Sequence, residues 1–329
     1  MIDMTHHAAN PVLSSSTYQP PRLVRANGIE ICYDVFGDDR AEPMLMIMGL
    51  GAQMIHWDDE FCKALAAHGY RVIRFDNRDI GLSSKMSGGK PLTLFEVAKL
   101  RYFGTPVAAP YKLADMATDA VALLDALHIR SAHIVGASMG GMIAQEIAIT
   151  YPERVRSLTS IMSTTGHPSL PQPSRAVAAM LLQPQPSGYD AFIERFKQTW
   201  LFLRVGSFPD DEARDLDRAE RTYARGLHPE GVGRQLRAIL ASGSRKKRLK
   251  SVTAPTLVIH GSVDPLVHPD AGRDTAASIP GARLLMIERM GHAIPISMWS
   301  GIVDAIARHA HGARAISQTV AGAIRAASR

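Results

Sequence analysis

The chain has 329 residues, 46% of them hydrophobic, and its 37 lysine and arginine side chains exceed its 31 acidic ones for a net charge of +6. A chain of this length and apolar content can bury a full core, either in one large domain with an insertion or in two domains. Five of the excess charges lie in 245–250, which contains no acid and has no aromatic residue nearby. The basicity is therefore local, so we expect a solvated connector there and no nucleic-acid partner.

The amino terminus and the two cysteines indicate the cellular compartment in which the protein is expected. Residues 1–20 are polar and lack the apolar stretch of a signal peptide, so we expect a flexible leader. No apolar run reaches the length of a membrane-spanning helix, which predicts no membrane partner. Cys32 falls in a strand-like run and Cys62 in a helix-like run. We expect both to be reduced and buried in a cytoplasmic protein, although the sequence leaves a disulfide between them open.

Strand-like and helix-like patterns alternate along the first half of the chain. Asn27-Gly28 joins two strand-like runs, Arg22–Ala26 and Ile29–Phe36, and predicts a hairpin. The strands predicted after it are 44–48, 70–75, 132–135 and 157–162, and the helices between them are 58–68, 113–128 and 139–150. Such alternation indicates parallel strands joined by right-handed crossovers. The predicted fold is α/β, with a mostly parallel central sheet flanked by helices.

The alternation breaks in 164–252, where prolines separate helix-like segments and no strand is predicted. A strand pattern resumes near Thr256, so 21–163 and 253–310 form two parts of one core around an insertion, and 311–329 form a tail. The insertion carries large apolar residues: Met180, Leu181, Leu182, Phe192, Trp200, Phe202 and Phe208. We expect about two of them to contact a substrate and the others to hold the inserted helices together.

Ser138 stands between Gly136 and Gly140, directly after the strand 132–135 and before the helix 139–150. Serine at the apex of a sharp strand–turn–helix is the arrangement of a nucleophile elbow. The small neighbours are needed because strand and helix approach closely there. A glycine-rich turn that merely packs a helix onto a strand is the alternative interpretation.

A serine hydroxyl becomes a nucleophile only when a base takes its proton and a carboxylate orients that base. Asp264 follows one strand-like run, and His292 follows another at 284–287. Because parallel strands end at one edge of a sheet, we expect Ser138, Asp264 and His292 to meet there. Other polar residues rank lower as bases, acids or metal ligands: His6, His7, His133, His260, His268, Asp58, Asp59, Asp79 and Asp270.

Three of these lower-ranked residues have specific expectations. His260 should satisfy local hydrogen bonds, and Asp79 should brace a loop by pairing with Arg78 or with backbone N–H groups. Asp270 is the substitute acid should Asp264 fail. The sequence contains no spaced ligand set, so no metal is expected.

These pieces, from about Gly28 to Ala307, resemble the α/β-hydrolase superfamily. Met48-Gly49-Leu50-Gly51 replaces the His-Gly of many relatives, and Asp79 replaces a glycine. Both departures resemble the branch that contains aclacinomycin methylesterase and similar small esterases. The resemblance implies that 164–252 form a helical cap, and that the backbone N–H of Leu50 helps to form an oxyanion hole. The other expected donor is the N–H of Met139, at the start of the elbow helix.

The leading functional hypothesis is serine-dependent hydrolysis of carboxylic esters, either methyl esters or short to medium acyl esters, with no cofactor. The partners would be a small-molecule ester and water. Two alternatives stay open. The same residues could cleave a carbon–carbon bond or an amino-terminal proline peptide, or form a peracid. The fold could also serve as a small-molecule receptor with little turnover. The tail 311–329 is either an added helix, an oligomer contact or a frayed end, which leaves a homo-oligomer open.

Overall fold

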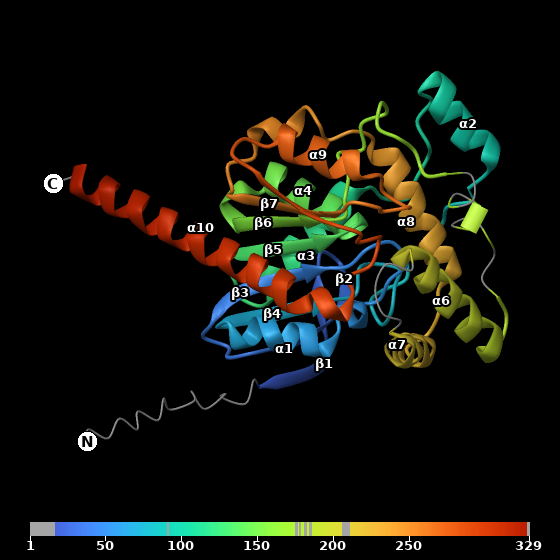
Figure 1. The fold of residues 1–329 in the computed structure, drawn as a ribbon, viewed down its shortest axis with the longest axis horizontal. Helices are drawn as coiled ribbons and strands as arrows, with labels where there is room; N and C mark the ends of the chain where they lie inside the picture. Colours follow the sequence, from blue (N-terminus) through green and yellow to red (C-terminus); the bar gives the residue numbers. More distant parts are fainter. Residues whose placement is uncertain are drawn as a thin grey trace, which may run out of the picture.

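The computed structural model describes residues 17–90, 92–174, 177, 179–180, 183, 186–205 and 211–327. Its centre is a sheet of eight strands in the order β1-β2-β4-β3-β5-β6-β7-β8 (Figure 1). The strands are β1 (Tyr18–Ala26), β2 (Ile29–Phe36), β3 (Glu42–Ile47), β4 (Tyr70–Phe75), β5 (Ala132–Ala137), β6 (Val155–Ile161), β7 (Thr256–Gly261) and β8 (Arg283–Ile287). β2 pairs antiparallel with β1 and with β4, and the other neighbours are parallel. The predicted fold class is confirmed.

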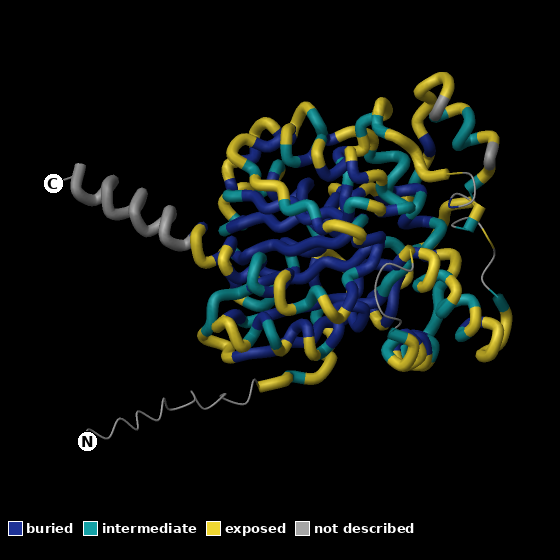
Figure 2. Tube along the Cα trace, in the orientation of Figure 1, coloured by how far each residue is buried: buried dark blue, intermediate teal, exposed yellow. Residues whose placement is uncertain are grey.

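Helices cover both faces of this sheet, and its inner strands are buried, whereas the edge strands β1 and β8 are partly exposed (Figure 2). The core helices and short 3-10 turns are α1 (Asp59–Ala67), α2 (Leu94–Phe103), α3 (Leu113–Ala126), α4 (Met139–Thr150), α9 (Pro269–Ser278), α10 (Trp299–Ala327), η1 (Met54–His56), η2 (Pro152–Arg154), η3 (Arg248–Ser251) and η4 (Ile296–Met298). Side chains alternate along β3: Met44 and Met46 share a core with α1 and α10, whereas Leu45 and Ile47 share one with α3 and α4. This is the period-two alternation of a strand buried on both faces.

The inserted helices lie between β6 and β7, beyond one edge of the sheet (Figure 1). They are α6 (Tyr189–Arg204), α7 (Glu212–Ala224) and α8 (Pro229–Ser242). Phe192, Phe196 and Trp200 lie on one face of α6, and Phe192 also packs against Tyr223 of α7. Phe192 therefore joins two cap helices, whereas the Trp200 ring lies 5.7 Å from that of His56 in the core, and Phe202 is exposed. Leu181, Leu182 and Phe208 lie outside the described residues.

The first strand corrects the predicted leader. β1 begins at Tyr18, inside the segment expected to be flexible, because the Tyr18 ring packs 4.8 Å from that of Phe36. Its register shifts between Gln19 and Arg22, where two prolines lack the N–H that a ladder requires. Residues 1–16 lie outside the described part of the chain.

Two helices also differ from expectation. α2 was not predicted, although Thr93 and Glu96 form a capping box at its start. α10 continues as one helix from Trp299 to Ala327, so Gly312 does not separate a second segment. None of the described helices is apolar over a length that could cross a membrane.

The two cysteines are buried and unpaired, as expected. Burial raises the pKa of the Cys32 thiol to about 11 and that of the Cys62 thiol to about 12, so both are neutral.

The basic segment 245–250 is solvated only in part: Lys247, Arg248 and Lys250 are exposed, as expected, but Arg245 is buried. Arg245 is only 1% exposed, and its guanidinium donates to Gln145 at 3.0 Å and to the Thr164 carbonyl at 2.8 Å. Arg248 pairs with Glu146 of α4 at 2.9 Å. The prediction was wrong for Arg245 because its partners come from distant elements.

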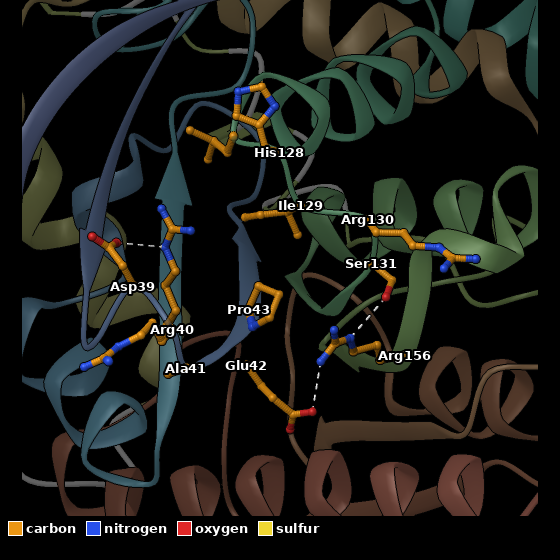
Figure 3. A pocket seen from close by; sticks show the side chains of 12 residues that line it. Asp39, Arg40, Ala41, Glu42, Pro43, His128, Ile129, Arg130, Ser131 and Arg156 are labelled. Carbon is orange, nitrogen blue, oxygen red and sulfur yellow. Dashed lines mark hydrogen bonds and ion pairs between the residues drawn. The ribbon is translucent and has the colours of Figure 1, made fainter. Parts of the chain in front are cut away.

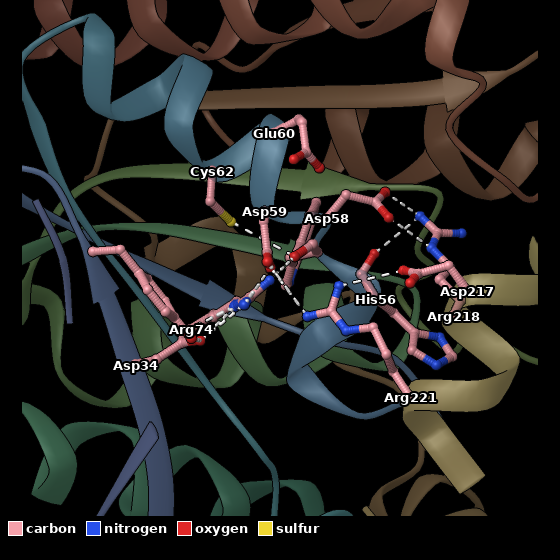
Figure 4. Close-up of polar contacts among 12 residues, drawn as sticks. Asp34, His56, Asp58, Asp59, Glu60, Cys62, Arg74, Asp217, Arg218 and Arg221 are labelled. Atoms are coloured by element: carbon pink, nitrogen blue, oxygen red, sulfur yellow. Dashed lines mark hydrogen bonds and ion pairs between the residues drawn. The ribbon is translucent and has the colours of Figure 1, made fainter. Parts of the chain in front are cut away.

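Five arginines of the cap bind carboxylates of the core. Two lie in α7, one directly follows α7, and two lie in α8. We call these the latch pairs: Arg218–Asp58, Arg221–Asp59, Arg225–Asp76, Arg234–Asp79 and Arg237–Glu96. Figure 4 shows Arg218 and Arg221 reaching from α7 toward Asp58 and Asp59 at the start of α1. The first and fourth pairs are nearly excluded from water, so salt screens them little.

Asp79 therefore has a partner other than the predicted one. It pairs with Arg234, and it accepts hydrogen bonds from Tyr111 at 2.6 Å and from the backbone N–H of Met86 at 2.7 Å. Arg78 instead binds Asp119 at 2.6 Å. The expected backbone contact is present, and the expected Arg78 contact is not.

Buried histidines give the fold a pH dependence. Burial lowers the pKa of His56 to about 3 and that of His133 to about 4, and it also lowers those of His260 and His309. Below about pH 6.5 these histidines bind protons in the unfolded chain but stay neutral in the folded protein. The free energy of unfolding should therefore fall as the pH drops, by up to about 1.4 kcal/mol per pH unit below pH 6 for each of His56 and His133. Urea unfolding between pH 7.5 and 5 measures this slope.

His133→Asn isolates one contribution to that slope. The amide can replace the 2.8 Å contact between the ring Nδ1 and Ser157 Oγ, but it does not titrate. We expect a slope shallower by up to about 1.4 kcal/mol per pH unit below pH 6. An unchanged slope would show that His133 is not held neutral.

Candidate active site

Ser138 lies at the sharp turn between β5 and α4. Its backbone has φ 54° and ψ −120°, a conformation that costs a non-glycine residue about 1–3 kcal/mol. Two contacts hold it there: the Ser138 N–H donates to the Ile161 carbonyl at 2.9 Å, and Ser163 Oγ donates to the Ser138 carbonyl at 2.8 Å. The turn therefore projects the serine side chain beyond the end of the strand.

The flanking glycines have no space for a side chain. A Cβ on Gly136 would overlap the carbonyl of Gly140, and one on Gly140 would overlap the carbonyl of Ile47 in β3. This is the close approach of strand and helix that the sequence pattern predicted.

A chain of hydrogen bonds joins the three residues expected to meet. His292 Nδ1 lies 2.6 Å from Asp264 Oδ2, and His292 Nε2 lies 3.0 Å from Ser138 Oγ. The other carboxylate oxygen of Asp264 accepts from the N–H groups of Leu266 at 2.9 Å and Val267 at 2.8 Å. Because an ionised carboxylate only accepts, Nδ1 carries the ring hydrogen and Nε2 presents its lone pair to the serine hydroxyl.

The parallel sheet explains why these side chains meet. β5, β7 and β8 run in the same direction, so the residues after their carboxyl ends lie at one edge. Asp264 and His292 are 5% and 6% exposed, whereas Ser138 is half-buried, so the serine is the member open to a substrate. The cap also touches this edge: the His292 N–H donates to the Leu203 carbonyl in the last turn of α6, at 2.8 Å.

The turn containing Leu50 follows β3 and lies against the serine. The Ala52 N–H donates to the Gly49 carbonyl at 3.3 Å, which closes a four-residue turn. Gly51, its third residue, has φ 68°, a positive value that a type II turn requires at this position. A Cβ on Gly49 would lie 3.1 Å from Ser138 Cβ. We call Gly49–Ala52 the oxyanion turn.

Met139 is the first residue of α4. Its N–H has no partner within the helix, and the helix dipole adds positive potential there. An oxyanion beside Ser138 would therefore be stabilised at this position, while the roles of Leu50 and Met139 as donors stay predictions.

The lower-ranked residues have other partners. His260 Nε2 donates to the Val267 carbonyl at 2.8 Å, which confirms its local role, and it also lies 3.5 Å from Asp264 Oδ2. The substitute acid Asp270 pairs with Arg273 at 3.1 Å on the surface of α9. His6 and His7 lie outside the described residues.

Sequence reasoning missed two side chains that hold the oxyanion turn. Asn77 donates to the Met48 carbonyl at 3.0 Å, and Gln235 of α8 accepts from the Gly51 N–H at 3.0 Å. Gln235 is 184 positions from Gly51, and no local pattern signals such a contact.

One cavity, of about 310 Å³, is drawn in Figure 3. Its lining includes Pro43, Arg71 and Arg156, at the amino ends of β3, β4 and β6. Those ends form the sheet edge opposite Ser138, so this cavity does not belong to the candidate site. No group of metal-ligating side chains occurs among the residues that the structure describes.

Residues 42–297 match the family model described as alpha/beta hydrolase fold. The chain belongs to the α/β-hydrolase family. This α/β-hydrolase is 33% identical to rhodomycin D methylesterase DauP of Streptomyces sp. (strain C5) over 315 residues, which cover 89% of this chain and 99% of that one. It is 32% identical to rhodomycin D methylesterase DnrP of Streptomyces peucetius, with the same coverage. Both matches bear out the predicted methylesterase branch.

The fold of this α/β-hydrolase also resembles solved structures. The enol-lactonase from Burkholderia xenovorans LB400 superposes with a TM-score of 0.69, covering 88% of this chain and 99% of that one. The two sequences are 19% identical, so this likeness shows the fold alone.

Proposed function

We propose that this α/β-hydrolase hydrolyses carboxylic esters of small molecules, with Ser138 as nucleophile, His292 as base and Asp264 as the acid that orients it. The observation that carries the proposal is the hydrogen-bond chain of 2.6 Å from Asp264 to His292 and 3.0 Å from His292 to Ser138. The half-buried serine at its end supports attack on an external substrate.

The reaction has two halves. Ser138 Oγ attacks the ester carbonyl carbon while His292 Nε2 takes the hydroxyl proton, and Asp264 stabilises the resulting imidazolium. The oxyanion of the tetrahedral intermediate receives hydrogen bonds from the N–H groups of Leu50 and Met139. The intermediate then expels the alcohol, which receives the proton from His292. Water, activated by the same imidazole, attacks the acyl-enzyme and releases the acid. Each of these steps uses only protein groups and water.

We further propose that the bond is a methyl ester. The two relatives at 33% and 32% identity are both named as methylesterases, and each aligns over 99% of its own length. The acyl part would then be the larger portion of the substrate, and the leaving group would be methanol.

A substrate panel tests the proposal. p-Nitrophenyl esters from acetate to palmitate measure the acyl preference, and methyl esters of bulky acids are followed by acid release. We expect turnover of the methyl esters and of short to medium p-nitrophenyl esters, with none of a proline amide. A folded protein inactive on every ester, or one faster on the amide, would contradict ester hydrolysis.

A further inference from the structure

We infer that Gln235, a residue of the cap helix α8, positions the oxyanion turn. The backbone N–H of Leu50 would then be placed to donate to the oxyanion only while the cap is packed against the core. The inference rests on the proposed function, because it concerns the stabilisation of an ester oxyanion. Gln235 would act through the backbone and would not touch the substrate, so we class it as a positioning residue.

Both polar atoms of the Gln235 side-chain amide form hydrogen bonds. Its Oε1 accepts from the Gly51 N–H at 3.0 Å, and its Nε2 donates to the Arg78 carbonyl at 2.9 Å. The residue is fully buried, at 0% exposure, whereas Gly51 is half-buried. The amide thus bridges the oxyanion turn and the loop after β4.

The helix that carries Gln235 is fixed tightly over the turn. A Cβ on Gly51 would be 3.3 Å from the Val232 side chain, and a Cβ on Gly231 would overlap the Asp79 carbonyl. Arg234, next to Gln235, binds Asp79 through two nitrogens, at 2.8 and 3.0 Å. The position of Gln235 therefore follows the position of α8 as a whole.

The segment after the turn is held by the cap as well. Gln53 Nε2 donates to the carbonyls of Thr222 and Gly226 at 3.0 Å each, and its Oε1 accepts from Arg225 Nε at 2.8 Å. On the core side, the turn depends on Asn77, which binds the Met48 carbonyl before it. The cap thus restrains the turn at Gly51 and just beyond it, and the core restrains it just before.

The geometry of the turn explains how this contact reaches the oxyanion. The Gly51 N–H belongs to the peptide that follows Leu50, and the Leu50 N–H belongs to the peptide that precedes it. In a four-residue turn closed between Gly49 and Ala52, rotating one of these peptides rotates the other. Without the acceptor on Gln235, the half-buried Gly51 N–H would lose its partner, and the turn would be free to rearrange.

The test is the variant Gln235→Met, which keeps the side-chain length and removes both polar atoms. Because removing a direct oxyanion donor slows an enzyme about 10²- to 10³-fold, we expect a smaller loss of about 10- to 100-fold in kcat. KM for a p-nitrophenyl ester should change by less than about twofold, since the contact acts on the transition state. A trifluoromethyl ketone, which mimics the tetrahedral intermediate, should bind more weakly by the same factor as kcat falls.

Gln145→Met is the matched control. Gln145 is also fully buried; it lies in α4 and binds Arg245 and Ser160 of β6, and neither contact involves the oxyanion turn. We expect this variant to lose stability but to keep kcat within about twofold. Gln235→Glu retains an acceptor for the Gly51 N–H, so it should lose less kcat than Gln235→Met. Should Gln235→Met fail to fold, Gln235→Ala replaces it in the same comparison.

Amide hydrogen exchange gives a readout that does not depend on turnover. The Gly51 N–H should be protected in the wild-type protein and should lose protection in Gln235→Met. An active wild type with unchanged kcat in Gln235→Met would overturn this inference and leave ester hydrolysis standing. Equal kcat losses in Gln235→Met and Gln145→Met would overturn it too. A wild type inactive on every ester would instead show that the proposed function fails, and the catalytic role of Gln235 would fail with it.

Discussion

Ser138→Ala should reduce ester hydrolysis by about 10⁵- to 10⁶-fold, because the nucleophile, the base and the acid act as one unit. The substitution removes only the hydroxyl group, and the backbone contacts to Ile161 and Ser163 that hold the turn remain. We therefore expect the same thermal unfolding midpoint within a few degrees. The rate is measured with a p-nitrophenyl ester under saturating conditions.

Ser160→Ala is the control for that loss. Ser160 is a fully buried serine on the adjacent strand β6, and its Oγ accepts from Gln145. Removing it should leave turnover within about twofold of wild type. If Ser138→Ala retained more than a tenth of the wild-type rate, another group would have to be the nucleophile.

Asp264→Asn is expected to lower kcat by about 10⁴-fold while preserving the fold, as in the serine proteases. The asparagine carbonyl can still accept from the N–H groups of Leu266 and Val267. Its amide nitrogen then faces His292 Nδ1 and donates to it. The ring hydrogen moves to Nε2, where it points at Ser138 and prevents the imidazole from accepting the hydroxyl proton.

Asp270→Asn serves as the comparison, since Asp270 is the substitute acid and pairs with Arg273 at the surface. It should have almost no effect on kcat. A loss below tenfold in Asp264→Asn, with a larger one in Asp270→Asn, would reverse the assignment of the acid.

The sheet and the meeting of Ser138, Asp264 and His292 could be predicted because their signals are local. Buried parallel strands appear as apolar runs, and β4 and α4 have the bounds that their patterns indicate. Each candidate residue lies within a few positions of the end of such a run, and parallel pairing then brings the strand ends together. The elbow glycines add a steric requirement that is visible within five residues.

The contacts between cap and core could not be predicted, since they join positions far apart in the chain. Asp79 was expected to pair with the adjacent Arg78, yet its partner is Arg234, 155 positions away. Arg245 looked solvated because the carbonyl and amide that receive its donors, on Thr164 and Gln145, are likewise distant. Charge composition within a segment does not reveal which opposite charge the fold brings to it.

The latch pairs limit how this scaffold can exchange parts with its relatives. A cap transplanted from a homologue that lacks Arg218 and Arg234 would leave Asp58 and Asp79 without these partners, and each orphaned carboxylate would cost about 3–5 kcal/mol. The cap of this chain would therefore tolerate point substitutions away from these pairs more easily than replacement as a whole. A successful chimera would have to carry both halves of each ionic contact across together.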